Sequence, residues 1–191
     1  MLKGALLQCA LSPSTSIGMS NTRLSPEKWI SAGFEVLIAD GPAALAAEPM
    51  ARRLGTTKGS FYWHFKDVPA YHAALVRHWH AAALADVMER LESSGAPDTR
   101  LRAFGHHILE TQSEAALRVW GQTDGLVAAS MAEVDAERLT YIQHLLNQFG
   151  LHNPAFATAI LATLIGLPEI KAPSDPGAGF DALVDTVLAL A

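Results

Sequence analysis

The stretch from Ala47 to Phe65, AEPMARRLGTTKGSFYWHF, decides the fold of this 191-residue chain. A first short helix is indicated by apolar residues at helical spacing, namely Met50, Ala51 and Leu54. Gly55 ends that helix, because glycine adopts the left-handed backbone conformation at little steric cost. Thr56 or Thr57 begins the next one, since a threonine hydroxyl can accept a hydrogen bond from a backbone N–H of the first turn. The stretch therefore predicts two short helices joined by a glycine turn.

The second of these helices has two different faces. Phe61 and Phe65 are four residues apart, so they share one face and can anchor the helix on a core. The opposite face carries polar and aromatic side chains, namely Thr57, Lys58, Ser60, Tyr62, Trp63 and His64. Such a helix can enter the major groove of DNA, so the stretch predicts a helix-turn-helix. An ordinary buried helical hairpin would explain the apolar residues but not the arginines and the lysine beside a polar aromatic ridge.

The segment from about Ser25 to Leu84 resembles the DNA-binding head of the TetR family of transcriptional regulators. The family pattern is an alanine, three residues and a glycine, then a short helix that ends in aromatic-x-His-Phe and a lysine. It stands here as Ala51 to Gly55 followed by TTKGSFYWHFK. The resemblance implies an all-α fold, in which a long helix joins an N-terminal three-helix DNA-binding head to a C-terminal helical ligand-binding and dimerisation body. Ala46 departs from the pattern, because a Ser or Thr cap that often touches phosphate is common there.

Side-chain chemistry and the resemblance together assign ten candidate DNA contacts: Arg52, Arg53, Thr57, Lys58, Gly59, Ser60, Tyr62, Trp63, His64 and Lys66. Lys58 can reach a phosphate or a guanine edge. Gly59 either permits close approach to the groove floor or loosens the start of the helix. Thr57 and Ser60 are short donors and acceptors suited to base edges or phosphates.

The remaining candidates surround the end of the second helix. Tyr62, His64 and Lys66 match family positions that usually hold phosphate. Trp63 either packs on the sugar–phosphate backbone or shields the helix. Arg52 and Arg53 add positive electrostatic potential from the first helix. For one of them, a solvated surface charge with no DNA contact is an equally good interpretation.

The charge of the chain is polarised. The net charge is −5, yet residues 23–80 carry seven basic and five acidic side chains, a net +2. Residues 81–191 carry six basic and fourteen acidic side chains, a net −8. Attraction to phosphate is therefore expected to act through a mildly basic head. An apolar fraction of 50% without a run of eighteen apolar residues suits a soluble helical protein that does not span a membrane.

The N-terminal segment is not expected to belong to the fold. Its apolar run is about four residues, shorter than an export signal needs. We expect residues 1–22 to be a disordered extension, or translation to start at Met19 rather than Met1. The single cysteine, Cys9, excludes an intramolecular disulfide and agrees with a cytoplasmic location.

Start and stop signals divide the rest of the chain into helices. A proline in the first turn favours a helix over about residues 25–39, capped by Ser25, and Asp67 opens a longer helix to about residue 92. That long helix is apolar on two sides, with His78 within one stripe as an expected core histidine. Further helices are expected to open at Asp98, Asn153 and Asp175. We expect a DNA-binding domain over residues 23–70 and an effector-binding and dimerisation domain over residues 71–191.

The resemblance implies a small, often apolar effector bound in the body. Candidate lining residues are large or polar side chains on otherwise apolar helices, each also explained by a place in the core: Trp79, Phe104, His107, Trp120, Met131 and Tyr141. The last two helices either complete the core of one chain or, as the resemblance implies, form a four-helix homodimer interface. Its candidate residues are Phe156, Ile160, Leu164, Leu167, Leu183 and Val187.

Eight histidines raise the alternative of a small helical metalloenzyme. His78 and His80 are two residues apart and point away from each other on a helix, and no zinc-protease, paired-cysteine or nucleophile-elbow motif is present. We therefore expect no catalytic residue, metal or other cofactor.

A dimerisation protein that has lost DNA binding is a second alternative, disfavoured by the intact Lys58 and Tyr62. The sequence predicts a ligand-responsive transcriptional regulator, with repression as the expected mode, that binds a pseudo-palindromic operator as a dimer. It does not identify the effector or the operator, nor does it distinguish repression from activation.

Overall fold

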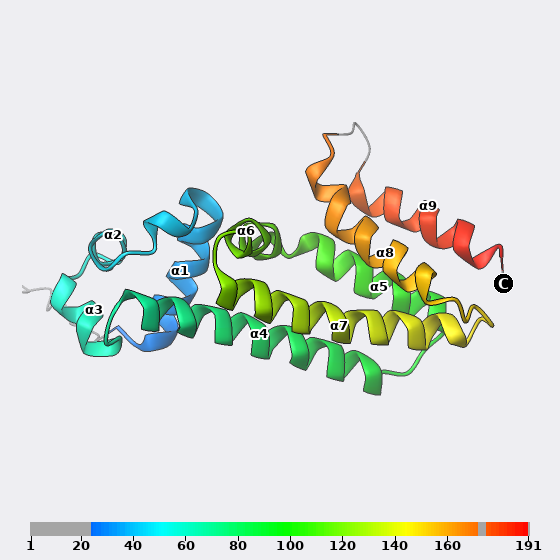
Figure 1. The fold of residues 1–191 in the computed structure, drawn as a ribbon, viewed down its shortest axis with the longest axis horizontal. Coiled ribbons are helices and arrows are strands. Elements are labelled where there is room, and N and C mark those ends of the chain that lie inside the picture. The colour runs from blue at the N-terminus through cyan, green and yellow to red at the C-terminus, as the bar shows by residue number, and fades with distance from the viewer. Residues whose placement is uncertain (1–23, 172–174, 191) are drawn as a thin grey trace, which may run out of the picture.

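The computed structural model describes residues 24–171 and 175–190, which form nine α-helices and two short 3-10 helices without a strand. Figure 1 shows an elongated molecule with a small helical head at one end and a larger helical body at the other. The all-α prediction is confirmed. The expectations for residues 1–22 and for Met1, Met19 and Cys9 lie outside the described residues.

Three helices form the head: α1 (Pro26–Asp40), α2 (Ala47–Arg53) and α3 (Lys58–His64). Gly55 has a φ of 61°, so the turn between α2 and α3 uses the left-handed conformation expected of a glycine. The Thr57 hydroxyl caps α3 by accepting a hydrogen bond from the Ser60 amide at 3.3 Å. Ala46 occupies the N-cap position of α2 and makes no cap hydrogen bond, because an alanine side chain has no polar atom.

The long connecting helix is α4 (Val68–Glu92), which Asp67 caps by accepting a hydrogen bond from the Ala70 amide at 2.7 Å. Tyr71 and Leu75 are fully buried at its head end, and Val87 is buried near its far end. The predicted core position of His78 is wrong. Its side chain is exposed and tilts against Phe34 at a ring distance of 6.0 Å, because α4 leaves a cavity on this side.

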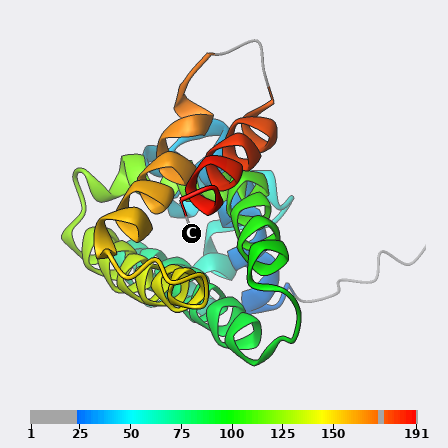
Figure 2. The same cartoon turned by 90° about the vertical axis from the view of Figure 1, so that its right-hand side faces the viewer.

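The body contains α5 (Pro97–Glu110), α6 (Gln112–Gly121), α7 (Gly125–Asn147), α8 (Pro154–Gly166) and α9 (Pro176–Leu188). Figures 1 and 2 show α7 running beside α4, with α8 lying across α7 and α9 beside α5. No helix in residues 24–171 or 175–190 is long and apolar enough to cross a membrane.

The caps follow the sequence at most of these helices. Asn153 and Asp175 cap α8 and α9 as predicted, and Asp124 caps α7. Two cap predictions are wrong. Ser25 stands at the N-cap of α1 without bonding a backbone amide, and its hydrogen bond to the Glu27 carboxylate lowers the pKa of Glu27 instead. Asp98 lies inside the first turn of α5, because the helix begins one residue earlier at Pro97.

Two hydrophobic cores lie along the molecule. The first unites the head with the beginning of α4, with α6 and with the first half of α7. The second joins α5, α8 and α9 to the rest of α7 and to Val87 of α4. The division between them crosses α4 between Trp79 and Val87, so the packing of the head extends well beyond residue 70. The boundary between residues 70 and 71 stays a prediction.

Candidate nucleic-acid interface

The outer face of α3 is the most distinctive surface of the head. Tyr62 is 47% exposed and Trp63 is 62% exposed, although both are large aromatic residues. Lys58 is exposed one turn before Tyr62, and its Nζ lies 5.9 Å from the centre of the Tyr62 ring. Large aromatic side chains exposed this far on neighbouring positions point to a surface that a partner covers.

The inner face of α3 is held on an aromatic cluster. Phe61 is fully buried and packs edge-on against Trp29 of α1 and Tyr71 of α4, at ring distances of 5.5 and 5.2 Å. The Tyr71 hydroxyl donates a hydrogen bond to the Trp29 carbonyl oxygen at 2.8 Å. Burial raises the pKa of Tyr71, so the hydroxyl keeps its proton as a donor. These contacts hold α3 rigidly to both α1 and α4.

His64 is less open than its neighbours on α3. Its Nε2 atom is buried and has no hydrogen-bond partner among the described residues, while the ring tilts toward Trp29 at 6.3 Å. Only the other edge of the imidazole can therefore meet a phosphate. Lys66 lies just beyond the helix and is exposed, as a phosphate contact requires.

Gly59 and Ser60 complete the start of α3. A Cβ at Gly59 would meet only the Thr57 hydroxyl, at 3.6 Å, so the fold itself does not require a glycine there. Ser60 is half-buried. The Thr57 hydroxyl is already engaged as the cap of α3 and retains its own proton for a further hydrogen bond.

The two arginines of α2 are paired with carboxylates. Arg52 lies 3.1 Å from Glu48, and Arg53 lies 3.4 Å from Glu35 of α1. Both pairs are exposed, so water and salt weaken them and either arginine can exchange its partner for a phosphate at little cost. The sequence analysis predicted neither pairing: Glu48 lies four residues before Arg52 on α2, whereas Glu35 lies on a different helix, which spacing alone cannot show.

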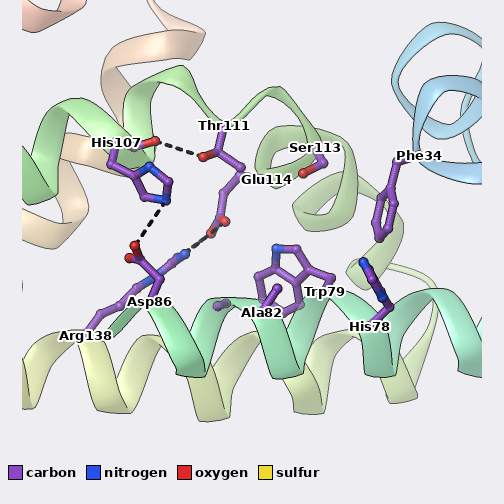
Figure 3. Close-up of a pocket in the computed structure, with 11 residues that line it drawn as sticks. Phe34, His78, Trp79, Ala82, Asp86, His107, Thr111, Ser113, Glu114 and Arg138 are labelled. Carbon is purple, nitrogen blue, oxygen red and sulfur yellow. Dashed lines mark hydrogen bonds and ion pairs between the residues drawn. The ribbon is translucent and has the colours of Figure 1, made fainter. Parts of the chain in front are cut away.

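A cavity of about 370 Å³ lies where the head meets the body. Figure 3 shows Trp79 and Asp86 on α4 at its floor, His107 at one end and Phe34 of α1 at the other. His107 Nε2 lies 3.5 Å from Asp86 Oδ1. Across the cavity, the Arg138 guanidinium holds the buried Glu114 carboxylate through two hydrogen bonds of 2.5 and 3.1 Å.

The structure brings only two of the six candidate effector residues, Trp79 and His107, to this cavity. Phe104 packs on Tyr141 in the second core at a ring distance of 5.0 Å. Trp120 packs on His72 at 5.0 Å, and Met131 is buried in the first core. Sequence reasoning missed Phe34, Asp86, Ser113, Glu114 and Arg138, because the cavity joins five helices and no single periodicity marks it.

The candidate dimer residues require a correction. Ile160, Leu164 and Val187 are buried within the single chain, so they cannot also meet a second copy. Phe156, Leu167 and Leu183 are partly buried against the same core. The strongest apolar stripes of α8 and α9 thus complete the core of one chain, which was the alternative reading. Among the described residues, no group of three or more His, Cys, Asp or Glu side chains could hold a metal ion.

Residues 30–67 match the family model described as "Bacterial regulatory proteins, tetR family". The match spans α1 to α3, and most of the chain has the same fold as solved transcriptional regulators, one of which is described as a TetR-family regulator. No curated protein sequence matches the chain.

Solved structures show the same fold over most of the chain. A transcriptional regulator from Rhodococcus sp. Rha1 superposes with a TM-score of 0.71 at 23% identity, covering 87% of this chain and 97% of that one. Reduced NemR from E. coli superposes with a TM-score of 0.70 at 17% identity, covering 85% of this chain and 96% of that one. The TetR-family regulator PfmR from Thermus thermophilus superposes with a TM-score of 0.65 at 15% identity, covering 85% of this chain and 97% of that one. At these identities the likeness establishes the fold alone.

Proposed function

We propose that this chain is a cytoplasmic, sequence-specific DNA-binding repressor that acts as a homodimer and responds to a small ligand. The observation that carries the proposal is the outer face of α3, where Lys58, Tyr62 and Trp63 stand exposed on a helix that buried Phe61 anchors. A rigid helix with this face fits the major groove, with the lysine and tyrosine on phosphates or base edges. Neither catalytic activity nor a cofactor is part of this proposal.

Dimerisation is proposed to use the outward faces of α8 and α9. These faces carry small exposed side chains that would let two helix pairs approach closely: Ala155, Ala159, Ala162, Ala178 and Ala182. Ala159→Arg should therefore convert a dimer into a monomer in sedimentation experiments, because a long charged side chain would enter the interface. Ala85→Arg, on an exposed face of α4, is the matched control and should leave the mass unchanged.

Ligand control is proposed to act through the cavity between head and body. Its wall includes Phe34 from the head helix α1 and Arg138 from the body helix α7. A ligand there would touch both parts and favour one relative arrangement over another. In a dimer, such a shift changes the spacing of the two recognition helices and thereby the affinity for an operator.

Selection of binding sites from a randomised double-stranded DNA library tests this function. The expected result is a pseudo-palindromic consensus whose half-sites lie about one helical turn, or a multiple of it, apart. The Lys58→Ala variant should enrich the same consensus less strongly. A consensus without two-fold symmetry would contradict the dimeric reading, and no enrichment by the unmodified protein would contradict DNA recognition itself.

A further inference from the structure

The cavity between head and body contains an unsatisfied hydrogen-bond donor. Trp79 is 6% exposed, and no residue in the described parts of the chain accepts a hydrogen bond from its indole N–H. Figure 3 shows that nitrogen directed into the cavity, on the side where Ser113 lies. The Ser113 hydroxyl likewise has no hydrogen bond to any described residue. Both groups open onto the cavity, so each can donate a hydrogen bond to an acceptor atom of a molecule bound there.

The charges around the cavity exclude an anionic acceptor. Asp86 and Glu114 border the cavity with Arg138, so the lining has one more carboxylate than guanidinium. Both terminal nitrogens of Arg138 are engaged by Glu114. His107 faces the Asp86 carboxylate rather than open space. A bound carboxylate or phosphate at this end would meet two carboxylates and no guanidinium free of one, while His78, the remaining basic side chain of the lining, packs against Phe34 at the opposite end.

The opposite end of the cavity suits a flat apolar group. Phe34 and His78 form an aromatic wall, with ring centres 6.0 Å apart. The Trp79 indole lies between that wall and the polar end, as Figure 3 shows. Aromatic rings of this kind pack edge-on or offset against another ring. The cavity therefore changes from aromatic to polar along its length.

We propose that this cavity binds an uncharged, planar aromatic molecule with a carbonyl oxygen, which accepts a hydrogen bond from the Trp79 indole N–H. The ring system lies against Phe34 and His78, and the oxygen lies between Trp79 and Ser113. Phe34 belongs to the DNA-binding head, so the ligand contacts the head directly. This inference rests on the proposed function, because it names the ligand class that would control the regulator.

Equilibrium dialysis of the full chain against three matched probes tests the inference. The probes are β-acetylnaphthalene, its hydrocarbon isostere β-isopropenylnaphthalene, and the anion β-naphthoate. The ketone is expected to bind roughly two- to tenfold more tightly than the hydrocarbon, the factor that one neutral hydrogen bond confers. The anion is expected to bind more weakly than the ketone.

Trp79→Phe removes the indole N–H and keeps a ring in place. This variant should lose most of the preference for the ketone over the hydrocarbon, and Trp79→Phe combined with Ser113→Ala should bind the two with equal affinity. Trp120→Phe is the matched control, because Trp120 is also buried but does not line the cavity, and it should keep the preference for the ketone. His78→Ala should weaken the ketone and the hydrocarbon by the same factor.

Several outcomes would overturn the inference: equal binding of ketone and hydrocarbon by the unmodified protein, tighter binding of the anion, a preference that is undiminished in Trp79→Phe, or no binding of any probe. The last result would mean that only water fills the cavity. The dialysis contains no DNA and the site selection contains no ligand. Failure of the ligand inference and failure of the proposed DNA-binding function are therefore separate results.

Discussion

The Tyr71 hydroxyl donates its hydrogen bond to the carbonyl oxygen of Trp29 across 42 residues of sequence, joining the connecting helix α4 to the first helix of the head. Phe61 of the recognition helix packs against both rings. The position of α3 is therefore coupled to α4 through a small set of buried aromatic residues. Any movement of α4 relative to the body would carry the recognition helix with it.

Tyr71→Phe should lower the free energy of unfolding at neutral pH by about 0.5–1.5 kcal/mol, because it removes one buried hydrogen bond. The pH dependence should change as well. Burial raises the pKa of Tyr71 in the folded state, so its contribution is complete below the unfolded pKa of about 10 and is lost as the pH rises further. Urea unfolding at pH 7 and at alkaline pH measures both effects. Tyr62→Phe, an exposed tyrosine, is the control, and an equal alkaline loss in the Tyr71 and Tyr62 variants would contradict the account.

Phe61→Ala should destabilise the protein by about 3–5 kcal/mol, because it opens a cavity beneath the recognition helix. Trp63→Ala, two residues later, should change stability by no more than about 0.5 kcal/mol, since its side chain is largely exposed. Thermal unfolding of the two variants separates the structural face of α3 from its outer face. Similar losses in both would mean that Trp63 supports the head.

Glu114→Ala should destabilise the protein by up to about 3–5 kcal/mol, because it leaves the buried Arg138 with only a longer contact of 3.6 Å to Asp135. Arg118 would lose a second contact to the same carboxylate, at 2.9 Å. Chemical denaturation, with Glu110→Ala as the exposed control, measures the difference. If the control loses as much stability as Glu114→Ala, the ion pair does not hold α6 to α7.

Gly105→Ala should destabilise the body by about 1–3 kcal/mol, since a Cβ there would overlap the Phe180 ring of α9. Gly166→Ala makes the same change in α8, where no atom lies within 4 Å, and should stabilise the helix by about 0.5–1 kcal/mol. The melting temperatures of the two variants should therefore move in opposite directions. A stable Gly105→Ala protein would show that α5 and α9 do not pack as closely as described.

Local signals in the sequence predicted the helices well. Gly55, Asp67 and Asn153 act through their own backbone conformation or through an amide within three residues, so neighbouring sequence is enough to locate them. The failures at Ser25 and Asp98 are also local. A side chain that can cap a helix was assumed to do so, yet one bonds Glu27 and the other lies inside its helix.

Features that depend on several helices could not be predicted. His78 lies on an apolar stripe of α4, but whether a stripe is covered depends on which helix crosses it. Ile160 and Leu164 lie on apolar stripes, and periodicity shows that such a face is buried without showing whether the same chain or a second copy buries it. The cavity between head and body could not be predicted for the same reason, since Phe34 and Arg138 line it together although they lie far apart in the sequence.

Fluorescence anisotropy of the protein on the DNA upstream of its own gene, at several salt concentrations, tests the central claim most directly. Specific binding should weaken steeply with salt, and Lys58→Ala should weaken it further and reduce the salt slope by about one. Lys171→Ala, an exposed lysine of the body, should bind as the unmodified protein does. Weak binding that is blind to sequence and equal in all three proteins would contradict the assignment of α3 as a recognition helix.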